Sequence, residues 1–139
     1  MIRFVIDASA AAEYLLRTSV GQKLGELIKE ADVLAPALLD AEVMAVLRRA
    51  LLQKRIEEHR ARVALRDLEA WPVDRVPHAA LLQEAWKHRH NVSAYDAFYV
   101  AVAKLYEAPL LTTDGPLSRA PGLGIVVQNL RLGSPVPLG

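Results

Sequence analysis

Carboxylates at the ends of predicted strands are the residues of this sequence best suited to chemistry. Asp7 directly follows the apolar run 2–6, and Asp114 comes shortly after the apolar run 110–112. In an open parallel sheet the ligand crevice lies beyond the carboxyl ends of the strands, where the strand order reverses. We therefore expect these two carboxylates to share one edge of a sheet.

Two further acidic residues are expected to join this edge. Asp96 lies in the first turn of a predicted helix. Glu42 lies in a predicted helix that is apolar nearly all round, so full solvation of its side chain is not expected there. Its neighbours at three- and four-residue spacing are apolar: Leu38, Leu39, Ala45 and Val46. A carboxylate in such surroundings needs a partner.

A cluster of carboxylates predicts a divalent metal ion. Two carboxylates about 5 Å apart repel by roughly 3 kcal/mol at an effective dielectric constant of about 20, and a bound cation reverses that sign. The chain has no cysteine, so a metal must bind to oxygen or imidazole, and Mg²⁺ or Mn²⁺ is favoured. Such an ion lowers the pKa of a bound water and orients it for in-line attack on a phosphodiester.

Three of the four acidic residues also have a purely structural interpretation. Asp7 could cap the following helix. Ser93 and Asp96 have the spacing of a capping box, which explains both residues without catalysis. Asp114 with Gly115 is a turn signal.

The acidic position on the third predicted helix is ambiguous. Asp40 and Glu42 share one apolar neighbourhood but project about 200° apart, so only one can face a crevice. Either side chain could instead be exposed or reach solvent along the helix surface. Periodicity does not choose between them.

Length and composition predict one α/β domain. The chain has 139 residues, of which 53% are apolar, which is enough for an ordinary core. No apolar run approaches the roughly 18 residues of a membrane span, and the first run is too short for a signal peptide, so we expect a cytoplasmic protein. Residues 48–66 hold seven Arg or Lys against two Glu, typical of a phosphate-binding surface or of a solvated helix face.

Short apolar runs alternate with helical stretches, which predicts a parallel sheet of four or five strands flanked by helices. The predicted strands are 2–6, 33–35, 73–76, 110–112 and 125–127. The predicted helices are 9–17 with Ser9 as N-cap, 20–31, 36–53 opened by Pro36, 57–70, 79–90 and 93–106. We expect a domain over residues 1–132 and an extended tail over residues 133–139.

The histidines and aromatic residues give weaker signals. His88 and His90 form an H-x-H pair without a carboxylate companion in sequence, which favours solvated residues over a metal site. His59 and His78 carry no signal. Core packing is expected, rather than base stacking, for five aromatic residues at helical positions: Trp71, Trp86, Tyr95, Phe98 and Tyr99.

Four motifs together resemble the PIN-domain ribonucleases, particularly the VapC-type toxins. They are F-V-I-D-A-S at 4–9, P-A-L-L-D-A-E at 36–42, Y-D-A-F-Y-V-A-V-A at 95–103 and L-L-T-T-D at 110–114. The resemblance covers nearly the whole chain and selects Glu42 over Asp40. It implies a metal-dependent endoribonuclease whose acidic site is Asp7, Glu42, Asp96 and Asp114.

The resemblance also implies supporting residues and partners. Ser9 and Thr112 match hydroxyl positions that hold carboxylates or metal-bound water. Where some members carry a further carboxylate, this chain has Gly115 and Pro116, so one Mg²⁺ is expected, with Mn²⁺ possible. The toxins of this family are small cytoplasmic proteins, often homodimers, that a cognate antitoxin holds inactive. The RNA substrate would be gripped by the catalytic domain itself, with four basic residues as candidates: Arg48, Arg49, Lys54 and Arg55.

Other functions fit the residues less well. A catalytically silent PIN-like binding or regulatory module would keep the fold and the acids without cleavage. A phosphotransferase with Asp7 as acceptor lacks a second acid, because Ser9 stands two residues on. Dinucleotide binding is disfavoured because residues 8–12 offer no glycine for a phosphate.

Overall fold

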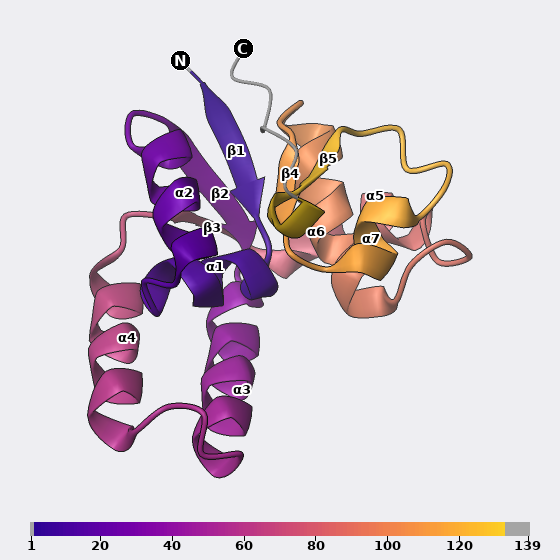
Figure 1. Cartoon of the computed structure of the whole chain (residues 1–139). Helices are drawn as coiled ribbons and strands as arrows, with labels where there is room; N and C mark the ends of the chain where they lie inside the picture. The colour runs from indigo at the N-terminus through magenta and orange to yellow at the C-terminus, as the bar shows by residue number, and fades with distance from the viewer. Residues whose placement is uncertain (1, 133–139) are drawn as a thin grey trace.

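A parallel five-stranded sheet forms the centre of the computed structural model, which describes residues 2–132 (Figure 1). The strand order is β3-β2-β1-β4-β5, and every neighbouring pair is parallel. The strands are β1 (Arg3–Ile6), β2 (Asp32–Pro36), β3 (Asp74–Val76), β4 (Leu110–Thr112) and β5 (Val127–Asn129). The predicted α/β class and the sheet of four or five strands are confirmed.

Seven α-helices and two short 3₁₀ helices connect the strands within the described residues. Those before β3 are α1 (Ala8–Leu15), α2 (Ser19–Ile28), α3 (Leu39–Leu52) and α4 (Glu58–Ala70). Those after β3 are η1 (His78–Leu81), α5 (Leu82–Trp86), α6 (Ala94–Leu105), α7 (Gly115–Arg119) and η2 (Leu130–Leu132). Helices α3 and α4 pack together and project beyond the sheet (Figure 1). No helix within residues 2–132 is long and apolar enough to cross a membrane.

The sheet has its topological switch point between β1 and β4. From β1 the chain moves outward to β2 and β3, then crosses back to place β4 on the other side of β1. Right-handed connections therefore put α1 to α4 on one face and α5 to α7 on the other. The carboxyl ends of β1 and β4 lie side by side, with Val5 opposite Leu110 and Ile6 opposite Leu111. Ligand crevices of parallel sheets form at such a point.

The core is centred on these two strands and on α6. Val5, Ile6, Leu110 and Leu111 are fully buried. Helix α6 packs against β1, β2 and β4. Its middle, residues 97–103, is buried nearly all round, as expected for an apolar segment without a solvent face. Burying each large apolar side chain contributes about 1.5 to 3 kcal/mol. The elements that carry Asp7, Asp96 and Asp114 are therefore anchored in the best-packed part of the molecule.

Several predicted boundaries are wrong by a few residues. Helix α1 begins at Ala8 and is capped by Asp7, not by Ser9. Pro36 is the last residue of β2 and does not open α3. Strand β5 starts at Val127, two residues later than predicted, because its register is set by pairing with β4. The predicted turn after Asp114 begins helix α7. The predicted tail, 133–139, lies outside the described residues.

The predicted helix 79–90 is split, and Trp86 does not lie in the core. The segment starts as the 3₁₀ helix η1 and continues as the short α5. Trp86, which was expected inside, is 66% exposed, and Leu82 is 53% exposed, whereas Leu81 and Ala85 are buried. A 3₁₀ helix turns every three residues, so it shifts the phase on which the 3.6-residue pattern was counted.

Core packing is confirmed for one of the aromatic residues and wrong for two. Tyr99 is 1% exposed, but Tyr95 is 62% exposed and, like Trp86, lies on the surface. Trp71 and Phe98 are half-buried and pack against the core from its edge. Only Tyr99 among the five is therefore enclosed by the elements that carry the acidic residues.

Candidate active site

Asp7 is a buried carboxylate held by three hydrogen bonds at the junction of β1 and α1. Its Oδ1 accepts from the Ala10 amide at 3.0 Å, which caps the helix, and from the Ser9 hydroxyl at 2.7 Å. Its Oδ2 accepts from the Thr112 hydroxyl at the end of β4. The side chain is 5% exposed. Asp7 therefore does cap α1, as considered from the sequence. Its carboxylate still lies at the switch point of the sheet, at the end of β1.

Burial has the largest effect on the pKa of Asp7. Desolvation raises the pKa of this carboxyl group to about 6, although the hydrogen bonds from Thr112, Ala10 and Ser9 lower it. The negative charge of Asp114 raises it further. Three donors would ordinarily hold a carboxylate well below its usual pKa, so the net rise means that burial outweighs them. A cation at this position would favour the ionised form.

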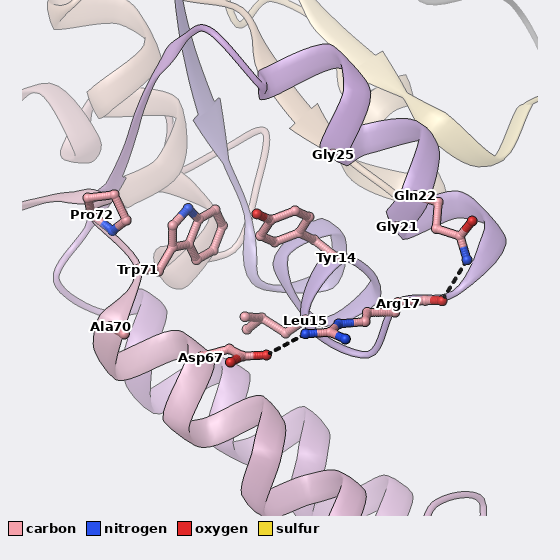
Figure 2. Close-up of a pocket in the computed structure, with 10 residues that line it drawn as sticks. All are labelled: Tyr14, Leu15, Arg17, Gly21, Gln22, Gly25, Asp67, Ala70, Trp71 and Pro72. Carbon is pink, nitrogen blue, oxygen red and sulfur yellow. Dashed lines mark hydrogen bonds and ion pairs between the residues drawn. The ribbon is translucent and has the colours of Figure 1, made fainter.

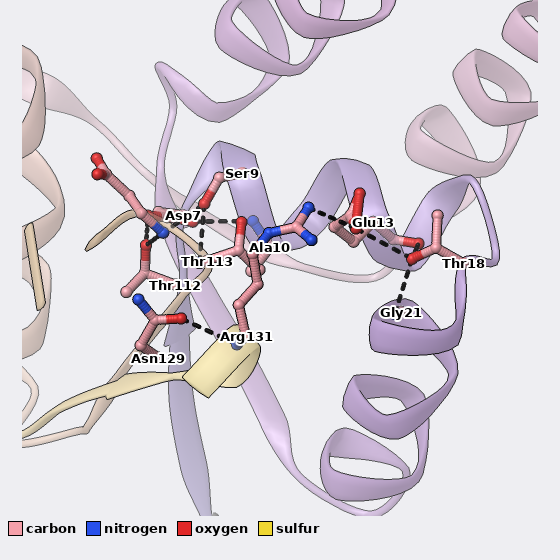
Figure 3. A network of polar contacts seen from close by, with 11 residues as sticks. Asp7, Ser9, Ala10, Glu13, Thr18, Gly21, Thr112, Thr113, Asn129 and Arg131 are labelled. Atoms are coloured by element: carbon pink, nitrogen blue, oxygen red, sulfur yellow. Dashed lines mark hydrogen bonds and ion pairs between the residues drawn. The ribbon is translucent and has the colours of Figure 1, made fainter. Parts of the chain in front are cut away.

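A hydroxyl network joins Asp7 to the turn that carries Asp114 (Figure 3). The Ser9 and Thr112 hydroxyls each donate to Asp7 and use their lone pairs to accept backbone amides. Ser9 accepts from Thr113 at 3.0 Å, and Thr112 accepts from Asp114 at 2.8 Å. Ser9 and Thr112 thus hold the Asp7 carboxylate in a fixed position relative to the turn that follows β4.

Asp96 and Glu42 lie in the first turns of α6 and α3. The pKa of Asp96 is raised by burial, then by the charge of Asp114, and to a smaller extent by that of Glu42, while the Ser93 hydroxyl lowers it. These repulsions link the carboxylates of all four predicted acids, because Asp114 also acts on Asp7. Ser93 accepts the Asp96 amide at 3.1 Å, so half of the predicted capping box is present.

Asp40 belongs to a separate ion pair. Arg75 on β3 donates from Nε to both carboxylate oxygens of Asp40, at 2.8 and 3.0 Å. The other guanidinium nitrogens donate to backbone carbonyls, including that of Leu68 at 2.8 Å. This bidentate contact explains Asp40 without the acidic site. Of the two acids, Glu42 is the one whose charge raises the pKa of Asp96, which supports the prediction that Glu42 belongs to the acidic site.

Tyr99 is a functional candidate that sequence reasoning assigned to the core alone. Its hydroxyl is buried and has no hydrogen-bond partner within residues 2–132. Burial raises the pKa of the phenol, and Glu42, followed by Asp7 and Asp96, raises it further. The phenol is therefore subject to the negative charge of three of the four acidic residues. A signal was present in the sequence, because residues three apart on a helix share a face and Tyr99 stands three after Asp96.

The donor set suits a hard divalent cation. Every candidate ligand is a carboxylate oxygen, the type preferred by Mg²⁺ and Mn²⁺. A cation or its water would also relieve the orphaned Tyr99 hydroxyl and the raised pKa of Asp7. As the side chains stand, no three acidic or imidazole groups of residues 2–132 enclose one point. Carboxylates repel without a cation between them, and Glu42, Asp96 and Asp114 are only partly buried, so packing does not fix their positions.

The predicted basic residues lie away from this site. Arg48, Arg49, Lys54 and Arg55 are exposed at the distal end of α3 and in the turn after it. At a rise of about 1.5 Å per residue, Arg48 stands roughly 9 Å along the helix from Glu42, and the turn stands farther. A role of these residues in binding the RNA substrate stays a prediction.

His88 corrects another prediction. It is 6% exposed, not solvated, and its Nε2 lies 3.1 Å from the carboxylate of Glu84. The companion carboxylate was present four residues earlier, on the same helical face. His90 is exposed, as predicted.

The molecule also has a pocket of about 390 Å³ between α1, α2 and α4 (Figure 2). Tyr14 and Trp71 line it with ring centroids 4.9 Å apart, and Arg17 meets Asp67 at its rim at 3.5 Å. None of the four acidic residues lines this pocket. Chemistry at the acidic site therefore does not use it.

Comparison with known proteins identifies the family. The model of the PIN domain matches residues 4–123. Ribonuclease VapC1 of Mycobacterium tuberculosis is 43% identical over 129 residues, which are 91% of this chain and 97% of that protein. Ribonuclease VapC12 of the same species is 35% identical over 118 residues, 85% of this chain and 92% of that protein.

Solved structures agree on the fold. VapBC2 from Rickettsia felis, bound to a DNA fragment from its promoter, contains a chain with a TM-score of 0.61 at 12% identity, covering 92% of this chain and 98% of that one. FitAcB from Neisseria gonorrhoeae gives a TM-score of 0.58 at 19% identity, covering 91% and 97%. The chain belongs to the PIN-domain family, in the group that contains the VapC ribonucleases.

Proposed function

We propose that the protein is a metal-dependent endoribonuclease and the toxin of a toxin–antitoxin pair. The observation that carries the proposal is the buried Asp7 carboxylate, held at the switch point of the sheet, where the charge of Asp114 raises its pKa. The charge of Asp114 also raises the pKa of Asp96. Relatives at 35 to 43% identity over most of the chain are named ribonucleases, which supports RNA as the substrate.

Asp7, Glu42, Asp96 and Asp114 would hold one Mg²⁺ or Mn²⁺. When bound, such an ion activates a water for attack on a phosphodiester and stabilises the leaving oxygen. Oxygen ligands of the required type and the orphaned donor of Tyr99 support the assignment. A single ion is proposed because Gly115 and Pro116 follow Asp114, where a further carboxylate would help to hold a second.

The chain's own side chains prepare this site. Ser9 and Thr112 hold the Asp7 carboxylate in one orientation, so that little reorganisation is needed on binding. The Tyr99 hydroxyl supplies a donor toward Glu42. Arg48, Arg49, Lys54 and Arg55 would contact RNA phosphates away from the reacting bond, which adds affinity and salt dependence.

The partners follow from the same proposal. A cognate antitoxin would hold the enzyme inactive, and the toxin would act as a homodimer in the cytoplasm. Two similar solved structures, VapBC2 and FitAcB, are two-component complexes, which supports an antitoxin partner. The alternative, a silent PIN-like binding module, would retain the antitoxin but bind no metal and cleave no RNA.

Cleavage of a structured RNA pool by antitoxin-free protein tests the proposal. Wild type, Asp96→Asn and the matched control Asp40→Asn are compared in Mg²⁺, Mn²⁺ and EDTA, with circular dichroism as the measure of folding. Asp96→Asn preserves size and the helix cap but removes the charge, whereas Asp40→Asn removes a charge two residues from Glu42 and outside the site.

Metal-dependent cleavage is expected in wild type and Asp40→Asn, with a loss of at least about 100-fold in Asp96→Asn. Equal cleavage by all three proteins would point to a contaminating nuclease. No cleavage and no metal binding by folded wild type would favour the silent binding module.

A further inference from the structure

His78 contacts the beginning of the helix that carries Glu42. Its Nε2 accepts the backbone N–H of Leu38 at 2.8 Å. Leu38 is the N-cap residue of α3, and its side chain offers no capping hydrogen bond. The same residue accepts the Glu42 amide through its carbonyl at 3.1 Å. The imidazole is therefore one hydrogen bond away from the backbone turn that places Glu42.

The other side of the contact is the helix that carries Asp96. The His78 ring packs on Phe98 with centroids 4.8 Å apart and an interplanar angle of 35°. Phe98 stands two residues after Asp96 on α6. Helices α3 and α6 come from opposite faces of the sheet, and this one side chain contacts the N-cap residue of α3 and the second turn of α6. It belongs to neither helix, because η1 carries it.

The hydrogen bond also defines the state of the ring. A backbone N–H can only donate, so Nε2 must be the unprotonated nitrogen, and Nδ1 carries the hydrogen of the neutral ring. A phenyl ring could replace the packing on Phe98 but not this acceptor. A glutamine amide oxygen lies at about the position of Nε2 and can accept the same N–H.

We infer that His78 is a positioning residue of the candidate active site, which fixes the first turn of α3 against α6 and so sets Glu42 relative to Asp96. Its effect on metal binding rests on the proposed function, but its effect on the start of α3 does not. Groups that orient metal ligands usually change metal affinity by about 10- to 100-fold. His78 acts through the backbone of its target, so a change of about tenfold is expected.

Three variants distinguish loss of the hydrogen-bond acceptor, loss of the ring packing and nonspecific destabilisation. His78→Phe keeps a ring against Phe98 and removes the acceptor, His78→Gln keeps an acceptor and removes the ring, and His59→Phe is the matched control at an exposed histidine of α4. Mn²⁺ binding is measured by calorimetry without RNA. Hydrogen exchange of the Leu38 and Glu42 amides is measured in EDTA, and thermal unfolding shows that each variant is folded.

His78→Phe is expected to bind Mn²⁺ about tenfold more weakly and to exchange the Leu38 amide faster. His78→Gln should recover both properties, and His59→Phe should match wild type. Wild-type affinity and exchange in folded His78→Phe would overturn the inference, and so would equal losses in the Phe and Gln variants. If wild type itself binds no Mn²⁺, the proposed function fails, and the amide exchange alone decides whether His78 holds α3.

Discussion

Thr112 at the end of β4 donates its hydroxyl hydrogen to the carboxylate of Asp7 at the end of β1, across 105 positions of sequence. Thr112 is fully buried, and its oxygen also accepts the Asp114 amide at 2.8 Å. One hydroxyl therefore fixes two of the four candidate ligands. The two strands that it joins are direct neighbours in the sheet.

Thr112→Val is expected to destabilise the protein and weaken metal binding together. Valine has nearly the same shape but leaves Oδ2 of Asp7 without its donor and the Asp114 amide without an acceptor, at a cost of about 1 to 3 kcal/mol in unfolding free energy. Denaturant unfolding and Mn²⁺ titration measure the two effects. Thr112→Ser, which keeps the hydroxyl, is the control and should retain metal affinity. Equal metal affinity in the Val variant would show that Thr112 does not orient Asp7.

Asp40→Asn and Glu42→Gln should have opposite profiles. Asp40 loses its ion pair with Arg75 but lies outside the site, and its side chain is 47% exposed, so unfolding free energy should fall by no more than about 1 kcal/mol, with RNA cleavage retained. Glu42→Gln removes a candidate ligand and a repulsion on Asp96, so cleavage should be lost while the fold persists. Parallel measurement of thermal unfolding and cleavage checks both. Loss of activity in Asp40→Asn alone would reverse the choice of acid.

The metal-free protein should lose stability as the pH rises from about 4 to 6. Asp7 has a pKa of about 6 when folded and an ordinary value of 3.8, so below pH 3.8 it is protonated in both states and its stabilising contribution is complete. Above that value the unfolded chain ionises first, and the contribution falls by about 3 kcal/mol by the time the folded carboxyl has titrated. Urea unfolding in EDTA across this range measures the slope.

Asp7→Asn is the control for this pH dependence, because asparagine still caps α1 but does not titrate. Its stability should change less with pH between 4 and 6. Mg²⁺ should stabilise wild type more at pH 7 than at pH 5, because it binds the ionised carboxylate. The same slope in both proteins would mean that burial of Asp7 does not raise its pKa.

Tyr99→Phe should separate metal binding from stability. Phenylalanine keeps the buried ring and removes a hydroxyl that has no partner within residues 2–132, so the unfolding free energy in EDTA should stay the same or increase. Mn²⁺ affinity should fall by about tenfold if the hydroxyl holds Glu42 or a metal-bound water. Tyr106→Phe, at an exposed position after α6, is the matched control. Unchanged affinity in Tyr99→Phe would restrict Tyr99 to packing.

The sheet could be predicted, and the four acids proposed, because both depend on short-range signals. Each strand of the centre is an apolar run, and Asp7 follows the first of them at once. The family resemblance then selected Glu42, which periodicity could not do. The Arg75–Asp40 contact that explains the choice joins residues 35 positions apart, so no local pattern contains it.

The surroundings of the acids could not be predicted, because they depend on packing between distant elements. The burial of His88 and the exposure of Trp86 both follow from the 3₁₀ turn at the start of their segment, which shifts every later side chain around the axis. The Tyr99 hydroxyl is enclosed because α6 packs against β1, β2 and β4. An apolar helix pattern predicts that the Tyr99 ring is buried, but it does not predict which groups surround the hydroxyl.

The neighbouring positions of β1 and β4 also order events during synthesis. A nascent chain that ends before Leu110 already carries Asp7, Glu42 and Asp96, but it lacks the strand that completes the sheet beside β1 and supplies Thr112 and Asp114. At about 5 to 20 residues per second, most of the translation time passes before that strand exists. On the ribosome, the nuclease site is therefore assembled last, after every other strand except β5 has been made.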